Sequence, residues 1–586
     1  MLKTTRRWMA AAMVLTVAVA GAGLARAQEA ALKLLPSDTQ AIIMAKSLKS
    51  LDNKIGNMTT QLGVQAPPNA ISTLVEGFGV ADAIDMDGSL VIALLPKAKD
   101  QPQAKPPVVV LIPAKDGKAL LVPFQPTDPK DGLITITGPQ GDEMTAALLN
   151  KYVVVGQTPE VVKQFLASPN KLDGVLKAEL KQIFSANDLT IYANTPEINK
   201  AYGNQIAGVK LMAMEAIKMQ KDPNAPLVQA MAALFFDGVK NYLTQSDAGV
   251  VGIRLTDDSV NLSVSGHFKP GSDIAKLIAA QKAAKVVDLT GLPAGKYLAA
   301  FSVAWDDVSV GAQITKTVND ILKYPALAQS PMAAKATEAM TTQMEVMKLT
   351  RGIKGVMLEP VLDSKAGKLN GVFIYAMSDA TKAKDLIQKF YESSALDFGT
   401  QAKGLKTTIK AEKDALKVAG MSFDKLTITA QVDETTVTPQ EAEMMKKTLT
   451  AMYGEDGTIT YYIGFDTKNL LAVIGSEDLL KKAVVSYQSN DGALEKDAGV
   501  IAGKKLLKNS NMMVAYMPVA SWVEMAKKAF LPEMADPAVD PAAPKAATPP
   551  MVMGMGATDT ALTTEIIMPM STVKFLVKEA QALQGH

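Results

Sequence analysis

The spacing of apolar and polar residues predicts short strands and amphipathic helices along most of the chain. Apolar, β-rich runs predict strands at 90–95, 108–112, 133–137, 152–155 and 260–264. Apolar residues at helical spacing predict helices at 47–62, 159–166, 176–184, 197–219 and 274–284, and in the second half at 382–391, 439–452 and 479–485.

Turn residues indicate how the strands connect. Thr256–Asp258 and Gly454–Gly457 each lie next to a strand-like run and predict hairpins. Strands and helices do not alternate strictly along the chain. We therefore predict the α+β class, with mostly antiparallel sheets packed by helices, rather than a doubly wound parallel sheet.

The same plan is found twice along the chain. Leu35-Pro36 and Leu292-Pro293 each open a strand-like run, 39–45 and 296–303. Ungapped matches in the same order then pair 150–156 with 469–475, 189–196 with 511–518, and 250–264 with 552–566. We predict two tandem related α+β domains, 28–288 and 289–586. The alternative is that α+β proteins share strand–turn–helix patterns without common descent.

Two segments of the second half have no match in the first. Met332–Met347 is rich in Met and Ala and predicts an inserted helix. Pro532–Pro550 is rich in Pro and Ala and predicts an internal loop of the second domain. The domain boundary is expected near 285–291.

The N-terminus has the pattern of a secretory signal peptide. Lys3, Arg6 and Arg7 precede an uncharged apolar run, 8–24, and Ala25–Ala27 is a small-x-small cleavage signal. The arginine pair also allows twin-arginine export, although the residues that usually follow such a pair are missing. We predict cleavage after Ala27 and export to the periplasm or the extracellular space.

The apolar run of the signal is shorter than the roughly 20 residues that a spanning helix needs. No later segment of comparable length lacks charges. We therefore expect no membrane span in the mature chain.

The composition of the chain excludes some classes of protein. The chain has 586 residues, of which 48% are hydrophobic, and its formal net charge is only +2. That is enough apolar material for folded cores and too little charge to attract nucleic acid. After the signal, Arg254 and Arg351 are the only arginines, which also disfavours phosphate-backbone recognition.

The chain has no cysteine and two histidines, His267 and His586. Disulfides, thiol nucleophiles and thiolate metal ligands are therefore excluded, as is a lipid anchor on cysteine. A Ser-His-Asp triad would need His267, which we predict to be a surface residue at a strand end. With so few histidines, zinc sites of the usual kind are not expected, and no catalytic residue is predicted.

Two segments contain residue types that calcium or copper sites use. Asp82, Asp85 and Asp87 resemble a calcium loop, but Ala83 and Leu94 occupy the required first and twelfth positions, so a turn before a strand is predicted. Met551, Met553 and Met555 could supply thioethers to Cu(I). Their matched residues are apolar and alternate along a strand (Gly249, Val251 and Ile253), so core packing is predicted for the methionines, and no metal ligand.

Two further patterns can be interpreted either as ordinary surface or core residues or as functional residues. Paired carboxylates, Asp257 with Asp258 and Glu441 with Glu443, are interpreted as turn and helix-surface residues. The Met- and Ala-rich helices 209–219, 227–236 and 332–347 could line an apolar groove, but ordinary core packing is favoured.

Leu35–Thr39 reads L-P-S-D-T just after the signal and leads into a strand. This opening, and the run 152–165, resemble a family of exported bacterial proteins that open with L-P-x-D-T. The second half departs from the pattern at Ala294–Lys296. The resemblance implies a cell-envelope or secreted protein, and no functional residue can be carried over from it.

The sequence therefore predicts a non-enzymatic exported protein that acts by binding or scaffolding. One alternative is a carrier that holds an apolar ligand between or within its two domains, and another is a hydrolase that uses carboxylates alone. No catalytic, cofactor-binding or metal-binding residue is predicted. The expected partner is an envelope protein or an apolar ligand, and not nucleic acid.

Overall fold

The computed structural model describes residues 30–64, 69–97, 106–138, 141–219, 225–282, 284, 288–322, 331–360, 369–392, 404–507, 510–530 and 549–584. The signal-peptide prediction (1–27) and all but the last two residues of the predicted loop 532–550 lie outside these ranges. The α+β prediction is confirmed, and the strand pairings described below are antiparallel.

The chain divides into two compact units. Unit 1 comprises 1–206, 240–272 and 563–586, and unit 2 comprises 207–239 and 273–562. The predicted domain limits, 28–288 and 289–586, remain predictions about the repeat.

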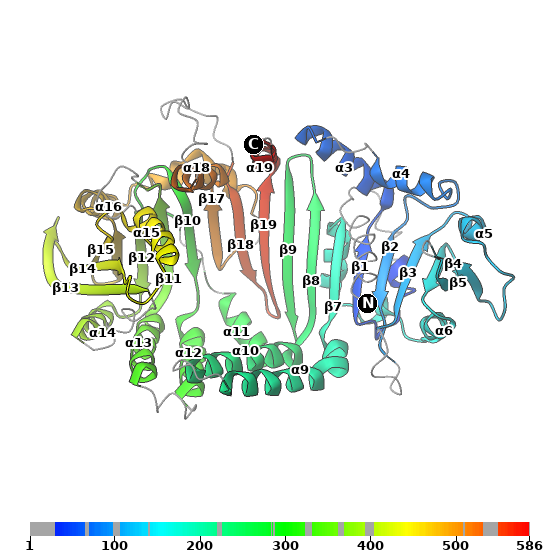
Figure 1. Cartoon of the computed structure of the whole chain (residues 1–586), viewed down its shortest axis with the longest axis horizontal. Helices are drawn as coiled ribbons and strands as arrows, with labels where there is room; N and C mark the ends of the chain where they lie inside the picture. The colour runs from blue at the N-terminus through cyan, green and yellow to red at the C-terminus, as the bar shows by residue number, and fades with distance from the viewer. Residues whose placement is uncertain are drawn as a thin grey trace. The chain divides into compact units, whose positions relative to one another are not determined.

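The sheet of unit 1 has the strand order β4-β5-β6-β3-β2-β1-β7-β8-β9 (Figure 1). These strands are β1 (Ala41–Ala45), β2 (Leu90–Leu94), β3 (Val108–Pro113), β4 (Ile134–Thr137), β5 (Glu143–Leu149), β6 (Tyr152–Gly156), β7 (Leu189–Asn194), β8 (Ser246–Leu255) and β9 (Ser259–Phe268). β9 also pairs with β19 (Ala561–Pro569).

Helices cover both faces of this sheet. Their bounds are α3 (Leu48–Leu62), α4 (Ala70–Gly77), α5 (Gly117–Leu121), α6 (Pro159–Ala167), α7 (Leu172–Val175), α8 (Ala178–Ala186) and α19 (Met570–Gln584). Phe165 of α6 and Phe184 of α8 are buried against one face, and Leu51 of α3 and Val75 of α4 against the other. Because successive strand residues point to opposite faces of the sheet, they pack into two separate hydrophobic cores, one on each face.

The sheet of unit 2 has the strand order β13-β14-β15-β16-β12-β11-β10-β17-β18. These strands are β10 (Tyr297–Ala304), β11 (Thr350–Leu358), β12 (Asn370–Met377), β13 (Leu405–Val418), β14 (Met421–Val432), β15 (Thr458–Phe465), β16 (Asn469–Ile474), β17 (Met513–Met517) and β18 (Met551–Ala557). Apart from β13, its strands occur in the same chain order and pair in the same order as those of unit 1.

The described helices that lie wholly in unit 2 are α11 (Asp273–Gln281), α12 (Asp307–Leu322), α13 (Pro331–Lys348), α14 (Ala380–Glu392), α15 (Pro439–Tyr453), α16 (Glu477–Ser489), α17 (Ala498–Lys504) and α18 (Val519–Phe530). Two longer helices, α9 (Thr195–Lys218) and α10 (Ala225–Gln245), have residues in both units. One face of the unit 2 sheet packs under α16 and α17, with Tyr516 and Val552 fully buried. A Cβ on Gly503 of α17 would lie 2.7 Å from the Tyr516 ring, so glycine permits this close helix–sheet approach.

Most predicted elements are confirmed within a few residues, and the helix predicted at 332–347 is α13. The prediction that this helix is an insertion is wrong, because α12 and α13 lie between β10 and β11 as α3 and α4 lie between β1 and β2. The hairpin predicted across Gly454–Gly457 is wrong. Gly454 has a φ of 83° and ends α15, and β15 follows it. The glycines that suggested a hairpin therefore form a helix-to-strand turn. In the part of the chain that the structure describes, no helix is long and apolar enough to cross a membrane.

Candidate functional sites

His267 is buried, which corrects the surface prediction. Its side chain is 3% exposed, and its Nε2 lies 2.9 Å from the Ser265 hydroxyl, which in turn lies 3.0 Å from that of Thr563. Burial lowers the pKa of His267. Its Nδ1 has no hydrogen-bond partner among the described residues. This arrangement is a buried polar contact between strands, because a triad would need a carboxylate at Nδ1 and access for a substrate.

The acidic residues Asp85, Glu441 and Glu443 have structural roles in a turn, a helix cap and an ion pair. Asp85 forms a turn just before β2, where its carboxylate accepts from the Asp87 N–H and its carbonyl from the Gly88 N–H. Glu441 belongs to the N-terminal capping box of α15, and Glu443 pairs with Lys447. No group of three or more His, Asp or Glu side chains placed to hold a metal ion occurs among the described residues.

Met551, Met553 and Met555 do alternate along a strand, β18, but they are only half-buried. The fully buried face of β18 is that of Val552 and Gly554. The sequence therefore predicted the shared strand face of these methionines correctly but overestimated how deeply they are buried. The three methionines belong to the opposite face of the unit 2 sheet, and that face is the first candidate site.

This face is a grid of three rows across seven strands, defined by the strand registers. The first row is Met555, Met513, Val303, Ile353, Tyr375, Leu470 and Phe465, and the middle row is Met553, Ala515, Phe301, Gly355, Phe373, Ala472 and Ile463. The third row consists of the paired residues Met551 and Met517 and the paired residues Ala299, Met357, Gly371, Ile474 and Tyr461. Met517 and Ala299 each lie one residue beyond the paired part of β17 and β10. None of these side chains is charged. We call this surface the uncharged face.

Burial differs sharply between the two faces of the same strands. On the uncharged face every side chain larger than alanine except that of Leu470 is half-buried. On the opposite face Val356, Val372, Leu471 and Val473 are fully buried. Among the described side chains, those of α13 and α14 form a cluster with the uncharged face around Leu470, Tyr375, Ile463, Phe465 and Ala472. The rest of the grid therefore keeps apolar surface that a packed core would have removed from water.

The Met-rich helices are a second apolar surface of unit 2. Leu211 and Met212 of α9 are 69% and 67% exposed, and Met231 and Phe235 of α10 are 63% and 67% exposed. Ordinary core packing, which the sequence analysis favoured, is therefore wrong for these segments. Their helical periodicity was identified correctly, but periodicity does not say whether an apolar stripe has a partner.

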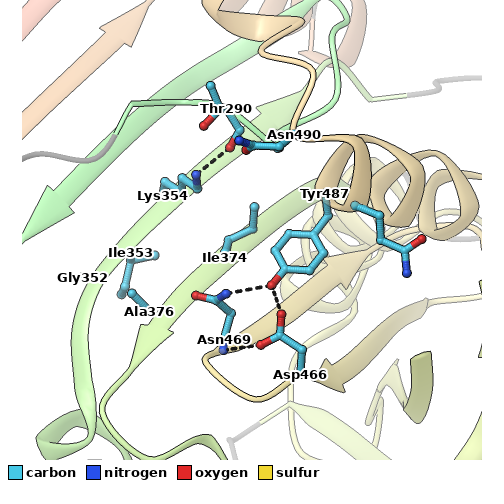
Figure 2. Close-up of a pocket in the computed structure, with 12 residues that line it drawn as sticks. Thr290, Gly352, Ile353, Lys354, Ile374, Ala376, Asp466, Asn469, Tyr487 and Asn490 are labelled. Atoms are coloured by element: carbon cyan, nitrogen blue, oxygen red, sulfur yellow. Dashed lines mark hydrogen bonds between the residues drawn. The ribbon is translucent and has the colours of Figure 1, made fainter. Parts of the chain in front are cut away.

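A recess of about 460 Å³ is the third candidate site (Figure 2). It opens beside Lys354 of β11 and Ile374 of β12, next to the C-terminal end of α16. Tyr487, Asn490 and the β15–β16 turn at Asp466 supply its other walls. Sequence reasoning missed all of these residues. One signal was available, because Lys354 interrupts the apolar alternation of β11.

Comparisons with known proteins assign neither a family nor a function to the chain. No family model matches the chain, and no curated protein matches it. A solved structure described as "Structure of crystal form IV of TP0453" matches 40% of this chain and 79% of that chain, at 7% identity and a TM-score of 0.21. A likeness at this score carries no argument about fold or function.

Proposed function

We propose that this protein is a non-enzymatic exported binding protein whose unit 2 carries an extended apolar ligand on its uncharged face. One observation carries the proposal: the grid contains 21 positions without a charge, and its large side chains remain half-buried. Exposed apolar surface costs free energy in water, at about 25 cal/mol per Å². A bound apolar molecule would recover that free energy.

The dimensions and composition of the face favour a linear ligand such as an acyl chain. Six strand spacings of about 4.8 Å make each row roughly 29 Å long. The hydrocarbon core of a bilayer, ~30 Å thick, is spanned by two acyl chains end to end, so one extended acyl chain fits within a row. The five methionines at one end have flexible, polarizable side chains that adapt to a variable apolar partner.

The test uses the chain from residue 28 onward and, as a fluorescent probe, the uncharged methyl ester of dansyl-labelled undecanoic acid. We expect Met553→Lys to weaken probe binding at least 10-fold, because it places an ammonium group in the middle row. Val485→Lys is the matched control, since Val485 lies on α16 and is already exposed. Ala472→Phe, which fills the same row without adding a charge, should also weaken binding.

Thermal unfolding of each variant separates loss of the site from loss of the fold. Folded Met553→Lys and Ala472→Phe proteins that bind the probe as tightly as the Val485→Lys control would refute the carrier function. Native mass spectrometry of the purified chain gives an independent result. An excess mass that is lost on denaturation, and that is absent from the Ala472→Phe variant, would support the proposal.

Scaffolding through α9 and α10 is the second candidate function. Their exposed apolar residues form a stripe of the kind that docks onto another protein. If the partner is a second copy, the wild type should self-associate in sedimentation velocity and Leu211→Glu should not. Val122→Glu, at an exposed position of unit 1, is the control. A wild type that remains monomeric at all concentrations would rule out docking to a second copy.

We also propose that the two predicted domains, 28–288 and 289–586, arose by tandem duplication. The matching strand order of the two sheets supports this, because each sequence match joins strands with corresponding neighbours. β6 lies between β3 and β5, and its match β16 lies between β12 and β15. Export after cleavage at Ala27, and membership of the L-P-x-D-T family, are proposals that rest on the sequence.

A further inference from the structure

The recess beside Lys354 lies in unit 2, and Ile353 is the one of its lining residues that also belongs to the uncharged face. Lys354 and Ile374 belong to the helix-covered face of the sheet, since they alternate with the uncharged-face residues Ile353 and Tyr375. Gly291 has a φ of 79°, and a Cβ on it would lie 3.6 Å from both Ile374 and Tyr487. Glycine therefore keeps this side of the recess open.

The wall opposite Lys354 is held by a network centred on Tyr487. Its hydroxyl donates to Asp466 and accepts from the Asn469 amide at 2.7 Å (Figure 2). The other Asp466 oxygen accepts from the backbone N–H groups of Lys468 and Asn469, at 2.7 and 2.6 Å. The carboxylate is thus already engaged within the wall and anchors the phenol.

The electrostatics of this network agree with its geometry. Burial alone would raise the pKa of Asp466, but the hydrogen bonds from Tyr487 and the backbone outweigh it, so its pKa is lowered. Burial and the bond to Asp466 raise the pKa of Tyr487. Asp466 is therefore ionised and Tyr487 neutral at neutral pH, and the wall is stable without a ligand.

The burial of the Lys354 ammonium is compensated only in part. Its ammonium donates to the Thr290 carbonyl at 2.6 Å, with the Asn490 side chain beside this contact in Figure 2. None of its three N–H groups meets a carboxylate within salt-bridge distance among the described residues. Burial lowers the pKa of Lys354, although the charge of Asp288 opposes this. A half-buried ammonium with spare donors is stabilised by an anion.

We propose that this recess binds a small organic carboxylate, with the anionic group on Lys354 and a short apolar body against Ile374. A volume of about 460 Å³ is in the range of small-molecule sites, which combine apolar walls with a few polar groups. A single lysine balances one negative charge. Phosphate recognition usually uses arginine forks or several backbone N–H groups, and the recess has no arginine.

The test is isothermal titration calorimetry of the full chain with hexanoate as the probe. We expect Lys354→Met to weaken hexanoate binding at least 10-fold and Lys354→Arg to retain most of it. Lys482→Met is the matched control, because Lys482 is an exposed lysine of α16. Ala376→Phe fills the recess without changing its charge and should also abolish binding.

The outcomes separate this site from the uncharged face. Hexanoate that binds equally to wild type, Lys354→Met and Ala376→Phe would overturn the proposal, as would wild type that binds no hexanoate. Inorganic phosphate that binds Lys354 more tightly than hexanoate would overturn the carboxylate assignment. Loss in both recess variants, with an unchanged melting temperature and unchanged binding of the dansyl probe, would support a distinct carboxylate site.

Discussion

The rings of Phe301 and Phe373 lie 6.2 Å apart, centroid to centroid, across Gly355 of the strand between them. A Cβ on Gly355 would come within 2.6 Å of the Phe373 ring and 3.0 Å of the Phe301 ring. The two rings can therefore meet in the middle row only because this position has no side chain. The uncharged face depends on this contact for its shape.

Gly355→Ala should separate the two rings and deform the middle row. Overpacking of this kind costs about 1–3 kcal/mol of unfolding free energy. We also expect affinity for the dansyl probe to fall several-fold, as measured by fluorescence titration. Gly503→Ala is the control, because it produces a similar clash with Tyr516 on the opposite face. Equal effects of the two substitutions on probe affinity would contradict a role for the uncharged face in binding.

The sequence indicated four strands of this face, through the matched segments 292–303, 469–475, 511–518 and 552–566, but neither β11 nor β12, nor the face itself. Alternation along β18 shows that Met551, Met553 and Met555 share one side, and that inference is local. Their alignment with Met513 and Met517 depends on the register of β17 against β18, across a long intervening segment. The position of β10 between β11 and β17 is likewise a tertiary fact.

The recess was beyond prediction for the same reason. It brings together Thr290, Lys354 and Tyr487, which are far apart in sequence and have no shared motif. His267 was misplaced because a polar residue near a strand end usually faces solvent. Here it pairs with Ser265, two residues away on the same strand face, and both are buried. Pairing of two polar residues within a strand was the available signal.

Asp52 of α3 caps a different helix, and its loss should destabilise unit 1. Its carboxylate accepts from the backbone N–H groups of Ile71 and Ser72, at 2.8 and 3.0 Å, in the first turn of α4. The N-cap residue itself, Asn69, makes no side-chain cap bond. Asp52→Ala leaves these donors without a partner, so we expect a loss of about 1–3 kcal/mol in urea unfolding.

Asp52→Asn is the informative companion of this variant. The amide keeps one acceptor oxygen and the size of the side chain but removes the negative charge. It should retain part of the stability lost in Asp52→Ala. If Asp52→Ala unfolds at the same urea concentration as the wild type, the side chain does not contribute to capping.

His267 should make stability depend on pH in the mildly acidic range. Burial lowers its pKa in the folded state, while in the unfolded chain the pKa is about 6.5. The unfolded state therefore takes up the proton first as the pH falls. Stability is complete above pH ~6.5 and declines as the pH falls from there through the lower pKa of the folded state.

His267→Gln removes this titration and keeps a polar side chain beside Ser265. We expect its melting temperature to change less between pH 7 and pH 5 than that of the wild type, measured by circular dichroism. The difference between the two curves isolates His267, because other titrating groups are common to both proteins. Parallel curves would show that His267 does not carry this pH dependence.

Helix α19 should be required for the stability of unit 1, although it ends the second predicted repeat. The Met570 N–H donates to the Asp258 carbonyl at 2.7 Å, Met570 and Thr572 are buried, and α19 packs on α3. At the matching place in the first repeat, α11 packs on α12 and β18 of unit 2. Each predicted repeat therefore has its last helix in the compact unit that contains most of the other.

Ending the chain at Pro569 removes this helix. Burial of a methionine side chain alone contributes about 1.5–3 kcal/mol, so unit 1 should lose at least that much. Hydrogen exchange should show faster exchange of the α3 amides in the shortened chain, while Lys574→Glu, at an exposed position of α19, should leave them unchanged. Unchanged α3 protection after truncation would mean that α19 rests on unit 1 without supporting it. Faster exchange would mean that the first predicted repeat lacks a complete core of its own, because unit 1 would then need a helix from the second.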